Sequence, residues 1–437
     1  MYKFLNNICN KCFGGNMTIF LICVIVLILI YTVFLQLIGS TPNAFNFIGS
    51  FIHLPKGMDS WNPMILALTH CKQFPDTDLY QTLLIENSIK FQYPPTSLLL
   101  FDIPERIFGI AYLKIAKIYD ILSLVSIFLT VFFTSQILIK ILKKYNFQTI
   151  TKSAHIYTYI LIFVITAFFY PLVWSYNLGQ IQTILTMLAT IALYLYLSDR
   201  KKLAGLCLGL ICLVKPQLGL IFVWGLIRKE WSMVIYGAIT VMVVLLPSIL
   251  LYGFHNHLDY LTALSHLSQY GESFHANQSI NGLMHRLLFN GNNLEWLGNS
   301  FPPYNPVVYF TTLFSSIIFI FFGLLWNFKN PKPNVIEMAL MMLCTTMASP
   351  IAWEQHYSIL LPIFVLLSPF VLHYFKNEKW KILIFVLAFT VSTQYFGTMN
   401  KFADSYLNIL QSYLYFSALV ILIFLFSISK KIKKCNT

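Results

Sequence analysis

The sequence has 437 residues, of which 57% are hydrophobic and only 10% are charged. Apolar runs of bilayer-spanning length recur along it, which excludes a soluble enzyme, whose helices would be apolar on one face only. The net charge of +13 is assigned to cytoplasmic loops and not to nucleic-acid binding, because lysine and arginine accumulate on the inner side of membrane proteins.

The apolar segments predict ten spanning helices. The first, residues 18–38, is too long for the apolar core of a signal peptide and lacks a clear cleavage site, so we expect it to remain as an anchor. The others are predicted at 119–139, 153–174, 180–198, 232–252, 304–327, 334–348, 351–373, 380–397 and 408–429. The expected fold is an all-α polytopic membrane protein, a single domain over residues 1–437.

One further apolar segment, residues 203–227, is interrupted at its centre by Lys215 and Pro216. A lysine at mid-bilayer costs roughly 2.5–3.5 kcal/mol, and the proline removes a backbone donor. If the segment crossed once, every later basic loop would face outward. If it turns at Lys215 and returns, 20 of the 29 lysines and arginines share one side. We therefore predict a re-entrant helix hairpin whose tip, Lys215, faces a polar chamber.

With both termini cytoplasmic, two long segments lie outside, residues 40–118 and 253–303. The first contains apolar pieces too short to span, which we expect to lie as interfacial helices. The second contains five of the ten histidines and a single basic residue, Arg286. Polar clusters at 176–182 and 349–357 end on the same face. A chamber lined by acids, imidazoles and amides suits a substrate with a phosphate and a polyhydroxyl part.

The metal-binding signals are weak. The eight cysteines are scattered and indicate no disulfide framework. Cys9 and Cys12 have CxxC spacing without a second pair, so two free thiols are the favoured interpretation. His255 and His257 also lack a second spaced pair. No metal ligand is predicted from these residues.

At the polar clusters the sequence resembles glycosyltransferase family 87, the polyprenol-phosphate-mannose-dependent mannosyltransferases of the GT-C class. The motifs that carry the resemblance occur in the family's order: Asp59 in KGMDSWNP, FQYPP (91–95), NLGQIQ (177–182), AGLCLGLICLVKP (204–216), NQSINGLMHR (277–286) and SPIAWEQH (349–356). Two positions depart from the family's pattern. Gln182 stands where asparagine is usual, and Gln355 replaces the first of two histidines, leaving His356.

The resemblance implies a GT-C-like bundle and transfer of a hexose, by default mannose, from a polyprenyl-phosphate donor to an acceptor on the external face, with inversion. Asp59 is the candidate general base. Asp76 and Asp78 are the alternative candidates for the base. This pair could instead hold a divalent cation as a cofactor. Lys215 and Arg286 are candidates to bind the donor phosphate. The candidate sugar- or substrate-binding residues are Gln180, Asn277, Gln278, Asn281 and His356. Trp353 is expected to act as an interfacial anchor.

Two other functions compete with this interpretation. One is an O-antigen-type polymerase or ligase, which would concentrate its polar residues in one late loop. The other is a secondary transporter or lipid flippase, which would carry paired broken helices in two repeated halves. The early carboxylate and the single break at Lys215 favour the transferase. The expected location is the bacterial inner membrane, where the partners are the lipid-linked sugar donor, a lipid or glycan acceptor and membrane lipids.

Overall fold

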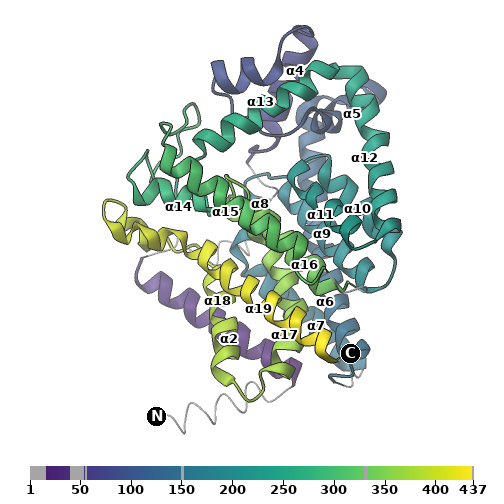
Figure 1. Ribbon diagram of the computed structural model, residues 1–437, viewed down its shortest axis with the longest axis vertical. Helices are drawn as coiled ribbons and strands as arrows, with labels where there is room; N and C mark the ends of the chain where they lie inside the picture. Colours follow the sequence, from purple (N-terminus) through teal and green to yellow (C-terminus); the bar gives the residue numbers. More distant parts are fainter. Residues whose placement is uncertain (1–15, 40–53, 55–56, 149–151, 329–332, 436–437) are drawn as a thin grey trace.

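The computed structural model describes residues 16–39, 54, 57–148, 152–328 and 333–435 (Figure 1). The Cys9–Cys12 pair and residues 40–53 of the first predicted external segment lie outside this range. Within it every regular element is a helix. The helices that fall on the predicted spans are α2 (Met17–Leu37), α6 (Tyr112–Lys144), α7 (Lys152–Ala167), α8 (Tyr170–Asn177), α9 (Gln182–Leu197), α12 (Trp231–Tyr252), α15 (Pro306–Leu325), α16 (Val335–Met347), α17 (Leu360–Tyr374), α18 (Lys379–Ser392) and α19 (Tyr413–Cys435).

The predicted all-α polytopic class is confirmed. Six helices of the described part are long and apolar enough to cross a membrane, and α7 with α8, bent by 64°, can form a seventh crossing. Three of the ten predicted spans are shorter. Helices α9, α16 and α18 have 16, 13 and 14 residues, which at about 1.5 Å per residue is less than the roughly 30 Å of a hydrocarbon core.

The segment around the central lysine doubles back on itself. It consists of α10 (Lys201–Cys212), the 3-10 helix η3 (Pro216–Gly219) and α11 (Leu220–Ile227). Both arms pack on α12, and their ends away from the Lys215 turn lie at the same level. A Cβ on Gly205 of the first arm or on Gly225 of the second would lie within 2.8 Å of Met233 atoms. Lys201, where the first arm begins, pairs with Glu230, just beyond the second, at 2.8 Å. How deeply this hairpin enters a bilayer stays a prediction.

A buried ion pair anchors the end of the second arm that lies away from the Lys215 turn. The Arg228 guanidinium donates hydrogen bonds to the Glu337 carboxylate of α16 and to the Asn327 carbonyl oxygen. Both charged side chains are removed from water. Because a buried charge without its partner is strongly unfavourable, this contact holds α11 against α15 and α16.

Short helices form a layer over one end of the bundle, where α4, α5 and α13 are seen at the top of Figure 1. The elements of this layer are α4 (Trp61–Gln73), the π-helix η1 (Gln81–Glu86), the 3-10 helix η2 (Pro95–Leu98), α5 (Leu99–Phe108), α13 (Phe254–Tyr270) and α14 (Ile280–Leu287). The 3-10 helices η4 (Glu354–Ile359), η5 (Gly397–Phe402) and η6 (Tyr406–Ser412) precede α17 and α19. Helices α13 and α14 supply 17 and 8 residues, so about half of the predicted external segment 253–303 is helical. The buried Asp102 carboxylate pairs with Lys72 at 2.7 Å and accepts from the Tyr252 hydroxyl at 2.9 Å, which ties α4, α5 and α12 together.

Candidate active site

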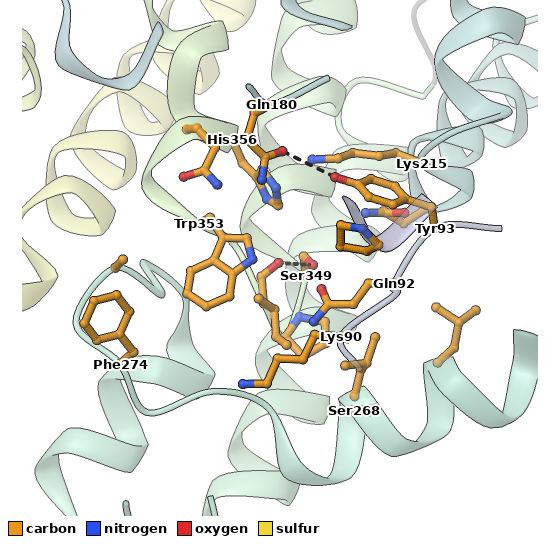
Figure 2. Close-up of a pocket in the computed structure, with 18 of the residues that line it drawn as sticks. Lys90, Gln92, Tyr93, Gln180, Lys215, Ser268, Phe274, Ser349, Trp353 and His356 are labelled. Atoms are coloured by element: carbon orange, nitrogen blue, oxygen red, sulfur yellow. Dashed lines mark hydrogen bonds between the residues drawn. The ribbon is translucent and has the colours of Figure 1, made fainter. Parts of the chain in front are cut away.

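A cavity of about 720 Å³ lies between this layer and the spanning helices. Segments remote in sequence form its wall, within residues 59–63, 87–93, 174–180, 214–220, 260–276, 296–299, 312–320 and 345–356. Four of the eight predicted site residues line it, namely Asp59, Gln180, Lys215 and His356. Figure 2 shows Gln180, Lys215 and His356 at one end of the cavity, together with Tyr93. The fold thus gathers a carboxylate, an amide, an ammonium and an imidazole in one chamber.

The turn after Gly179 holds Asp59 in place. The Asp59 backbone N–H donates to the Leu178 carbonyl oxygen at 3.0 Å, and the next N–H, of Ser60, donates to the Gly179 carbonyl oxygen at 3.3 Å. The Gln180 side-chain amide donates to the Asp59 carboxylate. The other end of that amide, its Oε1, accepts from the Ser60 hydroxyl at 2.8 Å. Since backbone and side chain are both restrained, the carboxylate faces the cavity in a defined orientation.

We expect Gly179→Ala to impair activity through the placement of Asp59. Gly179 has φ +64°, and a Cβ there would lie 2.1 Å from the Gly57 carbonyl oxygen. The backbone segments around residues 57 and 179 must therefore move apart. Gly109→Ala is a matched control, because Gly109 also has φ +64° but a Cβ would meet nothing within 4 Å. Strain alone costs about 1–3 kcal/mol in both variants. The midpoint of thermal unfolding should fall in both variants, and further in Gly179→Ala because of the added clash. Sugar transfer, measured well below both midpoints, should fall in Gly179→Ala alone; equal activities would contradict the placement role.

The environment of Asp59 changes its acidity. The Asp59 side chain is open to the cavity, yet the surrounding protein displaces much of its water. This desolvation raises the pKa of the carboxyl, and the hydrogen bond from Gln180 opposes the rise. A carboxylate whose pKa is raised is a stronger base than a fully solvated one, as proton abstraction from a hydroxyl requires.

Gln180→Leu should move the acid limb of the pH–rate profile to higher pH. A base works only when deprotonated, so activity is lost as the pH falls through the pKa of Asp59. Removing the amide donor removes the contact that favours the carboxylate form, and the pKa must rise further. The measurement is kcat/KM against pH. Gln217→Leu is the control, because Gln217 lines the same cavity. A midpoint that is unchanged, or lower, in Gln180→Leu would rule out this coupling.

Lys215 lies at the turn of the hairpin, buried at 8% exposure. Its ammonium donates to the Gln182 side-chain oxygen at 2.6 Å, so its partner is a neutral amide. The Thr96 hydroxyl donates to the Leu213 carbonyl oxygen at 2.5 Å, which satisfies part of the end of α10. A neutral amide does not compensate the charge of an ammonium, so an anionic group of a ligand in the cavity would be the charged partner of Lys215.

The other four predicted residues do not line the cavity. Arg286 is fully buried, and its guanidinium donates to the Asn277 carbonyl oxygen at 3.1 Å and to the Ser412 hydroxyl at 2.6 Å. Burial lowers the pKa of Arg286 to about 9. The Gln278 amide donates to the His275 and Gln411 carbonyl oxygens at 2.7 and 2.8 Å. These groups are hydrogen-bonded to other protein atoms. Their predicted contact with substrate stays a prediction.

Two of these four residues join the second external segment to other parts of the chain, Asn277 to the turn at 349–356 and Asn281 to α15. The Asn277 side-chain oxygen accepts from the Ala352 N–H at 3.0 Å, and Asn277 and Trp353 form an antiparallel bridge. The Asn281 amide donates to the Thr312 hydroxyl of α15 at 3.3 Å. As a result the motifs NQSINGLMHR and SPIAWEQH form one wall, which presents His356 and Trp353 to the cavity.

The alternative acids and the histidine pair lie elsewhere. Asp76 and Asp78 are exposed and do not line the cavity. The His257 ring contacts the Ser248 hydroxyl and the Gly253 carbonyl oxygen, at 3.0 and 2.9 Å. Among the residues that the structure describes, no three His, Cys, Asp or Glu side chains form a metal-binding group. A divalent cation therefore stays a prediction without an assigned ligand set.

Sequence reasoning missed several cavity residues. Tyr93, within FQYPP, bonds Ser60 and Gln180 through its hydroxyl at 2.8 and 3.3 Å. Lys90 and Trp296 also line the cavity. The only sequence signal for Lys90 is its position directly before FQYPP; Trp296 had none, because it lies in a loop without a motif.

The fold and the cavity define an all-helical, multi-pass membrane protein with a chamber at one end of its helix bundle, lined by apolar side chains and a few polar and charged ones. Sequence comparison supplies the family: residues 91–350, more than half of the chain, match the model of glycosyltransferase family 87. The chain belongs to this family and is a membrane glycosyltransferase. A comparison with curated proteins finds no match. Asp59 lies 32 residues before the matched range and His356 lies six residues after it, so their proposed roles depend on the cavity.

Proposed function

We propose that the protein transfers a hexose, by default mannose, from a polyprenyl-phosphate donor to an acceptor hydroxyl on the external face of the membrane. The observation that carries this proposal is that Asp59 and Lys215 open into the same cavity. A glycosyl transfer needs a base at the acceptor and positive charge at the leaving group, and these two residues supply them. The family assignment favours this reaction over a polymerase, ligase, transporter or flippase.

In the proposed reaction Asp59 takes the proton of the acceptor hydroxyl. The acceptor oxygen attacks the anomeric carbon as the bond from that carbon to the phosphate oxygen breaks, which inverts the configuration. The polyprenyl phosphate leaves with the electron pair, and the Lys215 ammonium stabilises its added charge. Lysine suits this role because it is a point charge with three donors, of which Gln182 accepts one.

The remaining predicted residues support this arrangement in different ways. We assign Gln180 to orienting the base and His356 to contact with the sugar or phosphate, since both line the cavity. We assign Arg286, Asn277, Gln278 and Asn281 to holding the wall that carries His356, beside the phosphate contact predicted for Arg286 and the substrate contacts predicted for the three amides. The proposed orientation, with both termini cytoplasmic in a bacterial inner membrane, follows from the distribution of basic residues.

The experiment that tests the function uses the purified full-length protein in lipid vesicles. Polyprenyl phosphates carrying radiolabelled mannose, glucose or galactose are supplied separately, and loss of label from the carrier is measured with a membrane-impermeant alkyl glycoside as acceptor. We expect label to leave one carrier and to appear in the glycoside, with inverted anomeric configuration. Retention of configuration, or use of a nucleotide sugar in place of every lipid donor, would contradict the proposal.

A further inference from the structure

The proposed reaction leaves one buried ion pair at the cavity without a purpose. Lys90 and Glu272 contact each other at 2.7 Å, and their side chains are only 6% and 5% exposed. Lys90 lines the cavity. Figure 2 shows Lys90 toward the opposite end from Gln180 and Lys215, with Trp353 between them. Removing two charges from water costs several kcal/mol per ion before their attraction is counted, so such a pair calls for an explanation.

The position of this pair is fixed from both sides. The Glu272 N–H donates to the Asn281 side-chain oxygen at 3.0 Å, and its carbonyl oxygen accepts from the Asn277 amide at 2.9 Å. The Lys90 ammonium lies 5.3 Å from the ring centre of Trp296 and 4.7 Å from that of Phe301. Three separate parts of the chain therefore hold the pair in place at the wall.

The two lysines of the cavity offer different chemistry. Lys215 donates to a neutral amide, which does not compensate its charge, so a phosphate suits it. Lys90 donates to the carboxylate of Glu272, a residue outside the cavity lining, so the charge that Lys90 presents to the cavity is already compensated. The remaining N–H groups of Lys90 can donate to hydroxyl groups, whereas an anion finds no uncompensated cation there.

Aromatic rings complete this end of the cavity. Trp296, Phe274 and Trp353 all line the same chamber as Lys90. Flat apolar rings beside hydrogen-bonding groups match a sugar ring, which has an apolar C–H face and a rim of hydroxyls. We propose that Trp296 and Lys90, the latter held and compensated by Glu272, form a subsite for a neutral sugar, and that this sugar is the acceptor. The assignment of this sugar as the acceptor rests on the proposed function, whereas the sugar subsite itself does not.

The test measures binding without any donor. The full-length protein in nanodiscs is titrated with hexyl glucoside and hexyl mannoside and with the corresponding hexyl hexuronides, which differ by a carboxylate at C6. We expect the neutral glycosides to bind about tenfold more tightly than the hexuronides, because Glu272 already compensates the charge of Lys90, so an added carboxylate would lose its water without gaining a free cation. Glu272→Gln should reduce this preference to near unity. Equal binding of the two kinds of glycoside by the unchanged protein would overturn the proposal.

A second variant avoids dependence on the buried pair. Trp296 is 48% exposed, so Trp296→Ala removes a ring without opening the core, and it should weaken hexoside binding about fivefold. Trp380, 60% exposed and not part of the cavity, provides the control: Trp380→Ala should leave binding unchanged. Unaltered binding in Trp296→Ala would also overturn the subsite. Failure of every lipid donor in the transfer assay would instead contradict the proposed function, so the two failures are distinguishable.

Discussion

Replacing Asp59 with asparagine is expected to reduce sugar transfer by about 10³-fold, within the range that a general base contributes. Asparagine has the same shape and can still bond Gln180 after its amide turns, but it cannot accept a proton from a hydroxyl. The backbone contacts of this position with Leu178 and Gly179 do not involve the side chain, so the fold should persist. The measurement is initial transfer rate with saturating donor and acceptor, beside thermal unfolding of the same preparation.

Asp76→Asn is the matched control for this experiment. Asp76 is an exposed acid of the same external segment, and it does not line the cavity. Its replacement should leave the rate within a factor of about two, since surface substitutions have small effects. If Asp59→Asn retained full activity while Asp76→Asn lost it, the base would have to be assigned to the exposed turn.

Lys215→Met is expected to lower kcat/KM for the lipid donor by about 10²-fold, the effect of removing one group that stabilises developing charge. Methionine has a similar length and no charge, so the buried position should accept it. The loss should appear chiefly in donor parameters, because the ammonium faces the leaving group in the proposed reaction. The acceptor KM, measured at saturating donor, should change far less.

Lys202→Met tests whether this loss is specific to the hairpin turn. Lys202 lies in α10, the first arm of the same hairpin, but near the start of that helix. Its side chain is exposed, and its ammonium lies 5.2 Å from the Tyr236 ring centre. We expect donor kinetics to be unchanged in that variant. A Lys215→Met protein that unfolds at lower temperature yet uses donor normally would show that Lys215 only caps the hairpin.

The composition of the chain was sufficient for the fold class. Apolar runs of about 20 residues have few alternatives to helices in a bilayer, and all ten predicted spans fall on helices. The lengths of α9, α16 and α18 were overestimated, because the predicted spans included the cap and turn residues next to these helices. The bend between α7 and α8 was not predicted, although Pro171 near the start of α8 is consistent with a break there.

All eight candidate residues were quoted from the family motifs, but only half of them line the cavity. Asp59, Gln180, Lys215 and His356 do so, whereas the four residues of NQSINGLMHR do not. Arg286 was also noted as the single basic residue of its segment, a pattern that does not say where its guanidinium points. In the structure that group donates to carbonyl oxygens within its own wall.

The sequence by itself determined that this chain is a helical membrane protein, that its polar residues collect near span ends, and that its motifs occur in the order of one glycosyltransferase family. Tertiary structure alone decided which polar side chains face the cavity and which are bound to neighbouring backbone. The physical reason is that hydropathy depends on local composition, whereas a polar group's partner depends on which distant segment packs beside it. Lys90 and Glu272, 182 residues apart in sequence, are in contact for that reason.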